Sequence, residues 1–292
     1  MPTFETPMPI AATVELSVGD IRVVASDRGE TVVKVSPSDA SQELDVRAAE
    51  QTLVEYSAGR LLVKAPRQRA LGLFGKAASV DVTIELPTGS QLQASASVAA
   101  LRCTGRLGDC RVKTSAGGLE VEDTGILELS TGIGAVVVDR VFGAADLSTG
   151  SGKIRVRSVE GSAVIKNSNG DIWIGEVSGE LRLKTANGEL SVDRAHAGVT
   201  AATANGDIRI GELTRGSVEV KTGSGRIELG IRAGSAARLD VHTAFGRVHN
   251  ELDTAASPQP SDETLQVQAR TSCGDIVIRR SVPVESTLEK EQ

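Results

Sequence analysis

The sequence predicts an all-β chain: a parallel β-solenoid (β-helix) of about 18 residues per coil, with an irregular β N-terminal region and a capping C-terminal coil. Three observations predict it. Segments of 18 residues repeat, apolar residues alternate on both sides of a glycine within each repeat, and a threonine or asparagine recurs three residues before that glycine. A fixed period of self-similarity is typical of a stacked architecture, in which each repeat contacts only its neighbours.

The composition agrees with a stack of short strands. The 292 residues include 31 glycines but only four Phe, one Tyr and one Trp, so small aliphatic side chains must fill the core. The formal net charge is −6, and acidic and basic residues are interspersed along the whole chain. Because no basic stripe is present to neutralise phosphates, no nucleic acid is expected as a partner.

Residues 1–100 are interpreted as an irregular β region that holds the first coils and the cap of the same solenoid. They contain strand patterns without an 18-residue register, and residues 19–23, GDIRV, repeat the signature of the later coils. The chain does not open on a basic segment followed by an apolar one, and no stretch approaches the roughly 18 apolar residues of a membrane span. We therefore expect a cytoplasmic protein with no membrane span.

A glycine-rich loop is predicted at residues 67–79, RQRALGLFGKAAS, with Leu71, Leu73 and Phe74 between basic residues. Two interpretations fit these apolar side chains. They either plug the end of the solenoid or form an exposed patch for a protein contact, because apolar residues with a charged rim can mark interaction sites.

Residues 101–250 are predicted to form the regular coils. The second and fourth residues after each mid-coil glycine are apolar, which predicts a strand with one face on the core. A second strand with the same alternation precedes the glycine, and a third apolar column follows it, so each coil is expected to close a three-sided prism. The mid-coil glycines are Gly134, Gly152, Gly170, Gly188, Gly206 and Gly225.

A polar ladder accompanies these glycines. The residue directly before the glycine is often Asn or Ser, and such pairs suit a corner that needs positive φ. Stacked Thr and Asn side chains are expected to hydrogen-bond to the coils above and below. The ladder positions are Thr131, Thr149, Asn167, Thr185, Thr203, Thr222, Thr243 and Thr271.

The C-terminal part divides into three segments. Residues 251–264 have the Pro, Ser and Asp content of a solvated loop. Residues 265–282 are predicted to form the last coil, and residues 283–292 a disordered polar tail.

The residues that carry chemistry form no catalytic or metal-binding pattern. The position after the mid-coil glycine mixes charges as a solubilising face does, although Asp171 and Glu189 on adjacent coils have the chemistry to hold a cation. His242 and His249 stand seven residues apart without a third ligand. We therefore predict no catalytic residue, no metal site and no cofactor.

Three further residues are distinctive. Cys103 and Cys110 fall at inward positions and are expected to be small buried hydrophobes, because their spacing fits neither a metal site nor a disulfide framework. Trp173 stands at an outward position where other coils have Arg or Ser, and it is a candidate protein-contact residue.

With the coils aligned, the chain resembles a bacterial family of β-strand-repeat proteins described as putative adhesins and otherwise as a domain of unknown function. The resemblance rests on the units TANGDIRIGEL (203–213), NSNGDIWIGEV (167–177) and TSCGDIVIRR (271–280). It implies the solenoid fold and supplies no catalytic residues.

The expected function is that of a non-enzymatic β-solenoid interaction or scaffold protein that binds another protein through the 67–79 loop or Trp173. Two alternatives stay open. One is a structural protein that polymerises end to end into a homo-oligomer, because strand edges at both ends are templates for pairing. The other is an exported adhesin-like protein, as the family description implies.

Overall fold

The computed structural model describes residues 1–66, 77–252 and 263–281. The chain divides into two compact units, unit 1 (Met1–Asn169) and unit 2 (Gly170–Gln292). Most of the predicted loops at 67–79 and 251–264, and the predicted tail at 283–292, lie outside the described residues.

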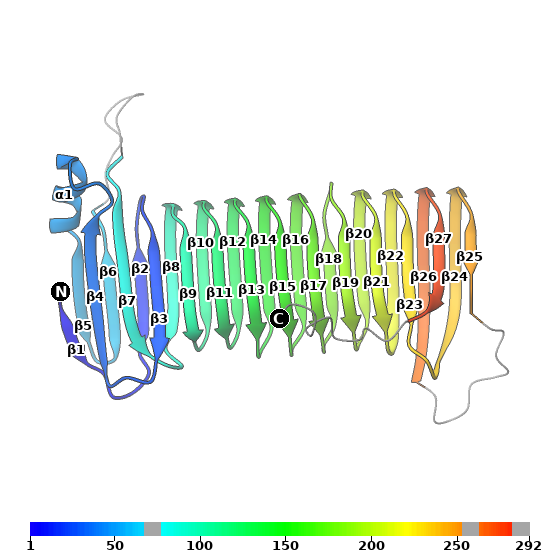
Figure 1. Ribbon diagram of the computed structural model, residues 1–292, viewed down its shortest axis with the longest axis horizontal. Coiled ribbons are helices and arrows are strands. Elements are labelled where there is room, and N and C mark those ends of the chain that lie inside the picture. Colours follow the sequence, from blue (N-terminus) through cyan, green and yellow to red (C-terminus); the bar gives the residue numbers. More distant parts are fainter. Residues whose placement is uncertain (67–76, 253–262, 282–292) are drawn as a thin grey trace, which may run out of the picture. The chain divides into compact units, whose positions relative to one another are not determined.

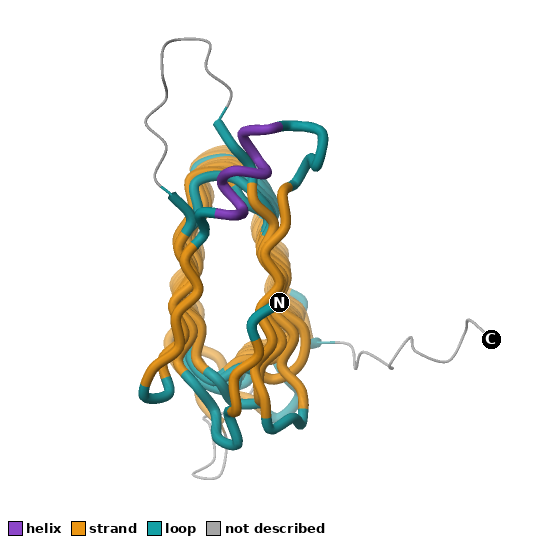
Figure 2. The backbone as a smooth tube through the Cα atoms, turned by 90° about the vertical axis from the view of Figure 1, so that its left-hand side faces the viewer, coloured by secondary structure: helices purple, strands orange, loops and turns teal. Residues whose placement is uncertain are grey.

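Unit 1 consists of two sheets that face one another, seen as opposite walls in Figure 2. Sheet A has the order β1 (Thr3–Glu5), β4 (Glu30–Pro37), β7 (Val80–Pro87), β3 (Ile21–Ser26), β9 (Leu101–Arg106), β11 (Leu119–Thr124), β13 (Val136–Val141) and β15 (Ile154–Val159). Sheet B has the order β5 (Leu53–Ser57), β6 (Arg60–Lys64), β2 (Ala11–Glu15), β8 (Gln91–Val98), β10 (Cys110–Ala116), β12 (Leu127–Ile133), β14 (Ala145–Ser151) and β16 (Ala163–Asn169).

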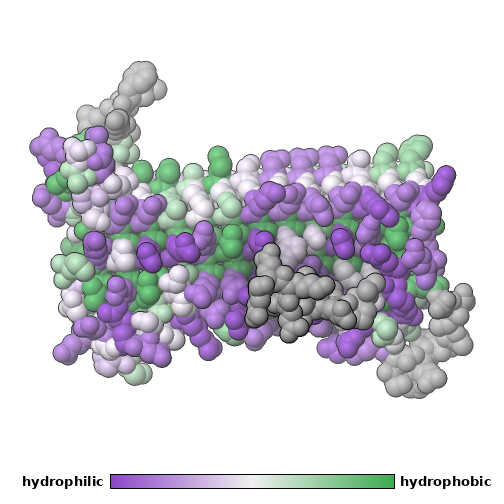
Figure 3. All heavy atoms as spheres, viewed as in Figure 1, coloured by the Kyte–Doolittle hydropathy of each residue, from purple (hydrophilic) through white to green (hydrophobic). Residues whose placement is uncertain are grey.

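The repeat and the fold class predicted from the sequence are confirmed in the register of these strands. Leu127 of β12 pairs in parallel with Ala145 of β14, and Val136 of β13 pairs with Ile154 of β15, an offset of 18 residues in both sheets. The offset shortens to 17 where Cys110 pairs with Leu127. Inward side chains are buried and outward ones are mostly exposed and polar, and on the face shown in Figure 3 hydrophilic residues interrupt the hydrophobic ones.

The expected three-sided prism is wrong, because the described coils of unit 1 close with two strands each. Val141 and Val159, members of the proposed third column, are the last residues of β13 and β15 and are fully buried. The alternation of burial breaks after Val138, so that Val141 returns to the core three residues later. A local irregularity in the strand therefore replaces the third corner.

A cap covers the N-terminal end of unit 1. Helix α1 (Glu43–Glu50) packs against β4 and β7, and Figure 2 shows it across one end of the two walls. The buried carboxylate of Asp45 accepts backbone hydrogen bonds from Ser79 (2.9 Å) and Asp39 (3.3 Å), which ties the helix to β7. At the outermost strands, the rings of Phe4 and Tyr56 lie 5.2 Å apart between the two sheets.

The core of unit 1 also contains the two cysteines that were expected to be buried. Cys103 and Cys110 are each 2% exposed, and both are free thiols, so this prediction is confirmed. A hydrogen bond to Cys110, together with burial, raises the pKa of the Cys103 thiol well above its usual value. The thiol is therefore neutral and behaves as a small apolar side chain.

Unit 2 repeats the arrangement with its own pair of sheets. Sheet C has the order β17 (Ile172–Val177), β19 (Leu190–Ala195), β21 (Ile208–Leu213), β23 (Ile227–Ile231), β27 (Ile276–Arg280) and β25 (Val248–Asn250). Sheet D has the order β18 (Leu181–Lys184), β20 (Val199–Asn205), β22 (Gly216–Ser224), β26 (Glu263–Cys273) and β24 (Ser235–Phe245).

The coil that ends the sequence does not end the stack. Strand β26 lies between β22 and β24, and β27 lies between β23 and β25, so the coil expected to be the last one is inserted one place earlier (Figure 1). The inward residues explain this order. Ile278 of β27 is fully buried, whereas its partner in the same column of the outermost coil is the exposed polar residue Asn250. The more apolar coil takes the position with a neighbour on both sides.

Candidate functional site

The threonine and asparagine ladder has a structural role, because its polar atoms bond to the backbone of the corners. In unit 1 the Asn167 amide donates to the carbonyl of Gly152 (2.8 Å), and in unit 2 the Thr222 hydroxyl donates to the carbonyl of Gly206 (2.9 Å). The same bond joins Thr271 to Gly225 (3.1 Å). These side chains are buried, so the ladder satisfies corner carbonyls and offers no outward ligand.

The aspartates that follow corner glycines are also committed to the backbone. The Asp171 carboxylate accepts the backbone N–H of Glu189 (3.2 Å), and Asp207 accepts that of Arg226 (2.8 Å). Asp275 accepts the N–H of Arg247 (2.8 Å) in the next coil. The expected solubilising face therefore includes side chains that bridge coils, and in the part of the chain that the structure describes no group of three His, Cys, Asp or Glu residues is placed to hold a metal ion.

The structure describes only one of the four predicted protein-contact residues. Leu71, Leu73 and Phe74 lie outside the described residues. Trp173 is the second residue of β17 and is half-buried, flanked by the buried Ile172 and Ile174. A contact role for these residues stays a prediction.

A small charged cluster in unit 2 joins neighbouring coils. The Nε2 atom of His196 lies 2.7 Å from Glu176, whose other carboxylate oxygen accepts a hydrogen bond from Arg194 (3.1 Å). The hydrogen bond with His196, followed by the charge of Arg194, lowers the pKa of Glu176 below its usual value of 4.5. The cluster lies at the surface and is partly exposed, so we interpret it as a weak link that joins neighbouring coils.

We expect the variant Glu176→Gln to lose less than about 1 kcal/mol of unfolding free energy near neutral pH. A carboxylate with a lowered pKa stabilises the fold above its usual pKa, and that contribution is lost as the pH falls through the lowered value. The difference between wild type and variant should therefore vanish in acid. Urea denaturation at several pH values measures it, with Glu189→Gln as a control that has no ion pair among the described residues. An undiminished difference in acid would contradict this role.

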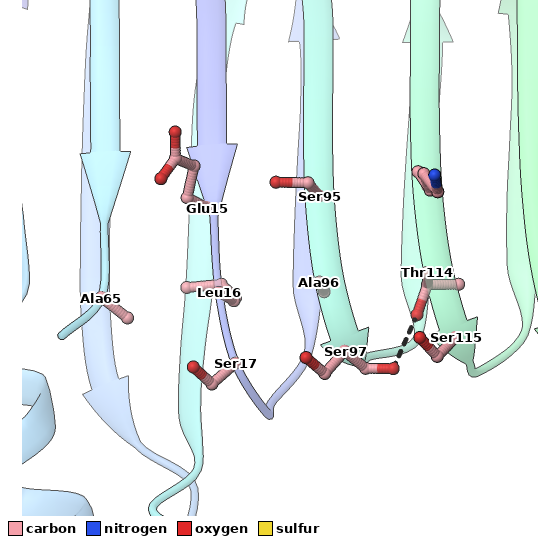
Figure 4. Close-up of a pocket in the computed structure, with 10 residues that line it drawn as sticks. Glu15, Leu16, Ser17, Ala65, Ser95, Ala96, Ser97, Thr114 and Ser115 are labelled. Carbon is pink, nitrogen blue, oxygen red and sulfur yellow. Dashed lines mark hydrogen bonds between the residues drawn. The ribbon is translucent and has the colours of Figure 1, made fainter. Parts of the chain in front are cut away.

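The outer face of sheet B in unit 1 carries a groove of about 430 Å³ over β2, β8 and β10. Figure 4 shows its labelled residues arranged along neighbouring strands. Its floor is formed by small side chains, because the outward positions that carry Arg, Glu or Gln elsewhere on these strands are occupied here by serine. The groove is lined by Glu15, Leu16, Ser17, Ala65, Ser95, Ala96, Ser97, Lys113, Thr114 and Ser115.

The groove presents polar groups that have no partner in the described part of the chain. Within the described residues, the side-chain hydroxyls of Ser17, Ser95, Ser97 and Ser115 make no hydrogen bond, and Lys113 forms no ion pair there. Glu15 differs, because Lys64 lies 2.9 Å from its carboxylate. The exposed ammonium of Lys113 beside four hydroxyls therefore offers donors to a polar ligand that carries a negative charge.

Sequence reasoning missed this groove. The available signal was the run of outward serines on residues 95–97 and at Ser115, aligned by the register that pairs Ser95 with Lys113. That alignment depends on the pairing of β8 with β10. The pairing could not be read from the sequence, because the N-terminal region has no regular repeat.

The part of the chain that the structure describes contains one helix, α1, and no helix long and apolar enough to cross a membrane. A family model described as Toastrack DUF4097 matches residues 59–281. No curated protein is a significant match.

Three solved structures align with nearly the whole chain. A putative adhesin from Bacteroides fragilis NCTC 9343 is 16% identical with a TM-score of 0.33, and the alignment covers 95% of each chain. A putative adhesin from Parabacteroides merdae ATCC 43184 is 13% identical with a TM-score of 0.31, again over 95% of each chain. A putative cell adhesion protein from Clostridium sporogenes ATCC 15579 is 11% identical with a TM-score of 0.24, over 96% of this chain and 98% of that one.

Proposed function

The chain belongs to the Toastrack DUF4097 family, as the resemblance predicted, and from this premise we propose that it is a non-enzymatic binding protein whose serine-lined groove holds a polar, acidic segment of another protein. The observation that carries the proposal is a set of groove donors that have no partner among the described residues, namely the Lys113 ammonium and the hydroxyls of Ser17, Ser95, Ser97 and Ser115. A segment with carboxylates and backbone carbonyls supplies the matching acceptors.

The rigid coils support a binding role over a catalytic one. The polar residues of the ladder and the corner aspartates are bonded to backbone groups, so they cannot act on a substrate without breaking the corners. In the groove, the one carboxylate, Glu15, is paired with Lys64. A general acid or base needs a free group within reach of the substrate, and the groove offers donors for binding instead.

The test is a selection of random peptides on the immobilised full chain, with Lys113→Glu as the comparison. We expect peptides rich in Asp and Glu to be enriched, and their dissociation constants to rise about tenfold or more on Lys113→Glu. The matched control is Lys166→Glu, the same change in the same outward row of sheet B but outside the groove. Selection of neutral or basic peptides, or equal losses in both variants, would rule out the groove.

A cytoplasmic location is part of the proposal. The free thiols of Cys103 and Cys110 in the core of unit 1 support it, because reducing conditions preserve them. Cell fractionation with an antibody against the chain tests it, and recovery from the cell surface would favour the exported alternative.

A further inference from the structure

Among the described residues, no further strand follows at the outer end of unit 2. Strands β24 and β25 are the last strands of sheets D and C among the described residues. Leu239 and Val241 of β24 occupy the same inward columns as Val267 and Ala269 of β26. The β26 residues are fully buried, whereas Leu239 and Val241 are only half-buried, because no further coil of the described chain covers them. Phe245 is 76% exposed and Val248 44% exposed at this same end.

The edge of β24 lacks the devices that usually prevent strands from pairing between molecules. Natural edge strands are kept short, or carry proline, a bulge or an inward-pointing charge. Strand β24 is 11 residues long, contains no proline, and has its charged residues Arg238 and Asp240 on the outward face. The end of unit 1 contrasts with it, since β1 has three residues and β5 has five, both pair antiparallel with their neighbours, and α1 packs on the adjacent strand β4.

We propose that the free edge of β24 pairs antiparallel with β24 of a second copy of this chain, about a two-fold axis through Leu239. In that register Leu239 faces its own copy, and Ala237 faces Val241 of the other copy. On the outward face, Arg238 of each copy lies opposite Asp240 of the other. Sheet D then continues from one copy into the next, and the half-buried end of one core covers the other.

The charges select this register. Centring the pair on residue 238 or 240 places two arginines or two aspartates directly opposite one another, which is unfavourable. Centring it on residue 241 removes the contact between Arg238 and Asp240. Within the described residues Arg238 forms no ion pair of its own, while Asp240 lies 3.5 Å from Arg270. The arginine is thus available to a partner strand.

The symmetry of the pair predicts a closed dimer. The contact is isologous, because the same edge of β24 is used by both copies. Pairing therefore leaves no free β24 edge for a third copy, and the assembly does not grow further. This inference concerns an end of unit 2 and does not depend on the groove in unit 1.

The first experiment is light scattering behind size exclusion on the full chain over a roughly hundredfold concentration range, with charge-reversal variants. We expect a dimer whose dissociation constant rises about tenfold or more in Arg238→Asp, since the introduced carboxylate of each copy then lies opposite Asp240 of the other. The double variant R238D/D240R restores the opposite charges, and we expect it to return toward the wild-type value. Circular dichroism confirms that the variants are folded. A wild-type monomer at every concentration, or a dimer indifferent to R238D, overturns the proposal.

The second experiment tests the register in a Cys273→Ser background, which removes the exposed native thiol. A cysteine at position 239 faces its own copy, so L239C should be cross-linked to a dimer by a short bis-maleimide. A cysteine at 241 lies four residues from its own copy along the strand, so V241C should not. Equal cross-linking contradicts the register. The β24 edge could instead be covered by residues 282–292 of the same chain, and a chain ending at Ser281 tests this. If that shortened chain dimerises while the full chain is monomeric, residues 282–292 cover the edge and the proposal is wrong.

Discussion

Replacing Gly117 by alanine is expected to lower the unfolding free energy by about 3 kcal/mol or more. Gly117 adopts φ +135°, and a Cβ built there lies 1.9 Å from the carbonyl oxygen of Ala99 in the preceding coil. Neither atom can move away, because the carbonyl belongs to a corner that is itself hydrogen-bonded to the next coil. Backbone strain and a steric clash therefore act together. Urea denaturation followed by circular dichroism measures the loss.

The neighbouring glycine provides a matched control. A Cβ at Gly118 meets its nearest atom, the carbonyl oxygen of Ala135, at 3.8 Å, which is ordinary van der Waals contact, and its backbone lies outside the positive-φ region. We expect Gly118→Ala to change the unfolding free energy by less than about 1 kcal/mol. Equal effects of the two variants would show that the close approach of stacked corners does not limit the stability of unit 1.

The variant Ile278→Asn is expected to lose about 3 kcal/mol of unfolding free energy. The change buries an amide among apolar side chains and removes a buried aliphatic side chain. Ile278 is fully buried between Leu229 on one side and Asn250 on the other. The prediction tests the inserted order of the coils. If the coil of residues 265–280 ended the stack, its inward side chains would be partly exposed and the polar residue would cost little.

Asn250 supplies the control for that experiment. It occupies the same column as Ile278 but is exposed, and its side chain accepts the backbone N–H of Leu252 at 3.1 Å. We expect Asn250→Ala to cost less than about 1 kcal/mol. A large loss at Asn250 with a small one at Ile278 would reverse the order of the two coils.

Much of the fold could be predicted from local rules that repeat. The alternation around Gly152 and Gly206 predicted strands on both sides of a corner, and the threonine three residues earlier predicted a ladder, because each coil meets the same steric and hydrogen-bonding demands. Burial of Cys103 and Cys110 followed from the same register.

The features that escaped prediction depend on which segments become neighbours. Nothing local to residues 235–250 shows that they pair with β26 and not with β22, since the apolar columns fit either partner. Helix α1 was not predicted, because its sequence is only weakly apolar and its periodicity gave no signal. The buried carboxylate of Asp45 holds it in place instead. The serine-lined groove arises from three strands whose spacing in sequence is irregular.

The inserted coil also bears on how the chain is made. Synthesis runs from the N-terminus, so residues 235–250 leave the ribosome before residues 263–280, the only strands that β24 and β25 pair with among the described residues. An unfinished chain must either leave β24 unpaired or dock it temporarily beside β22. The final strands then have to enter a space between segments that already exist. Unit 2 therefore completes its outer end only after residues 263–280 have been synthesised.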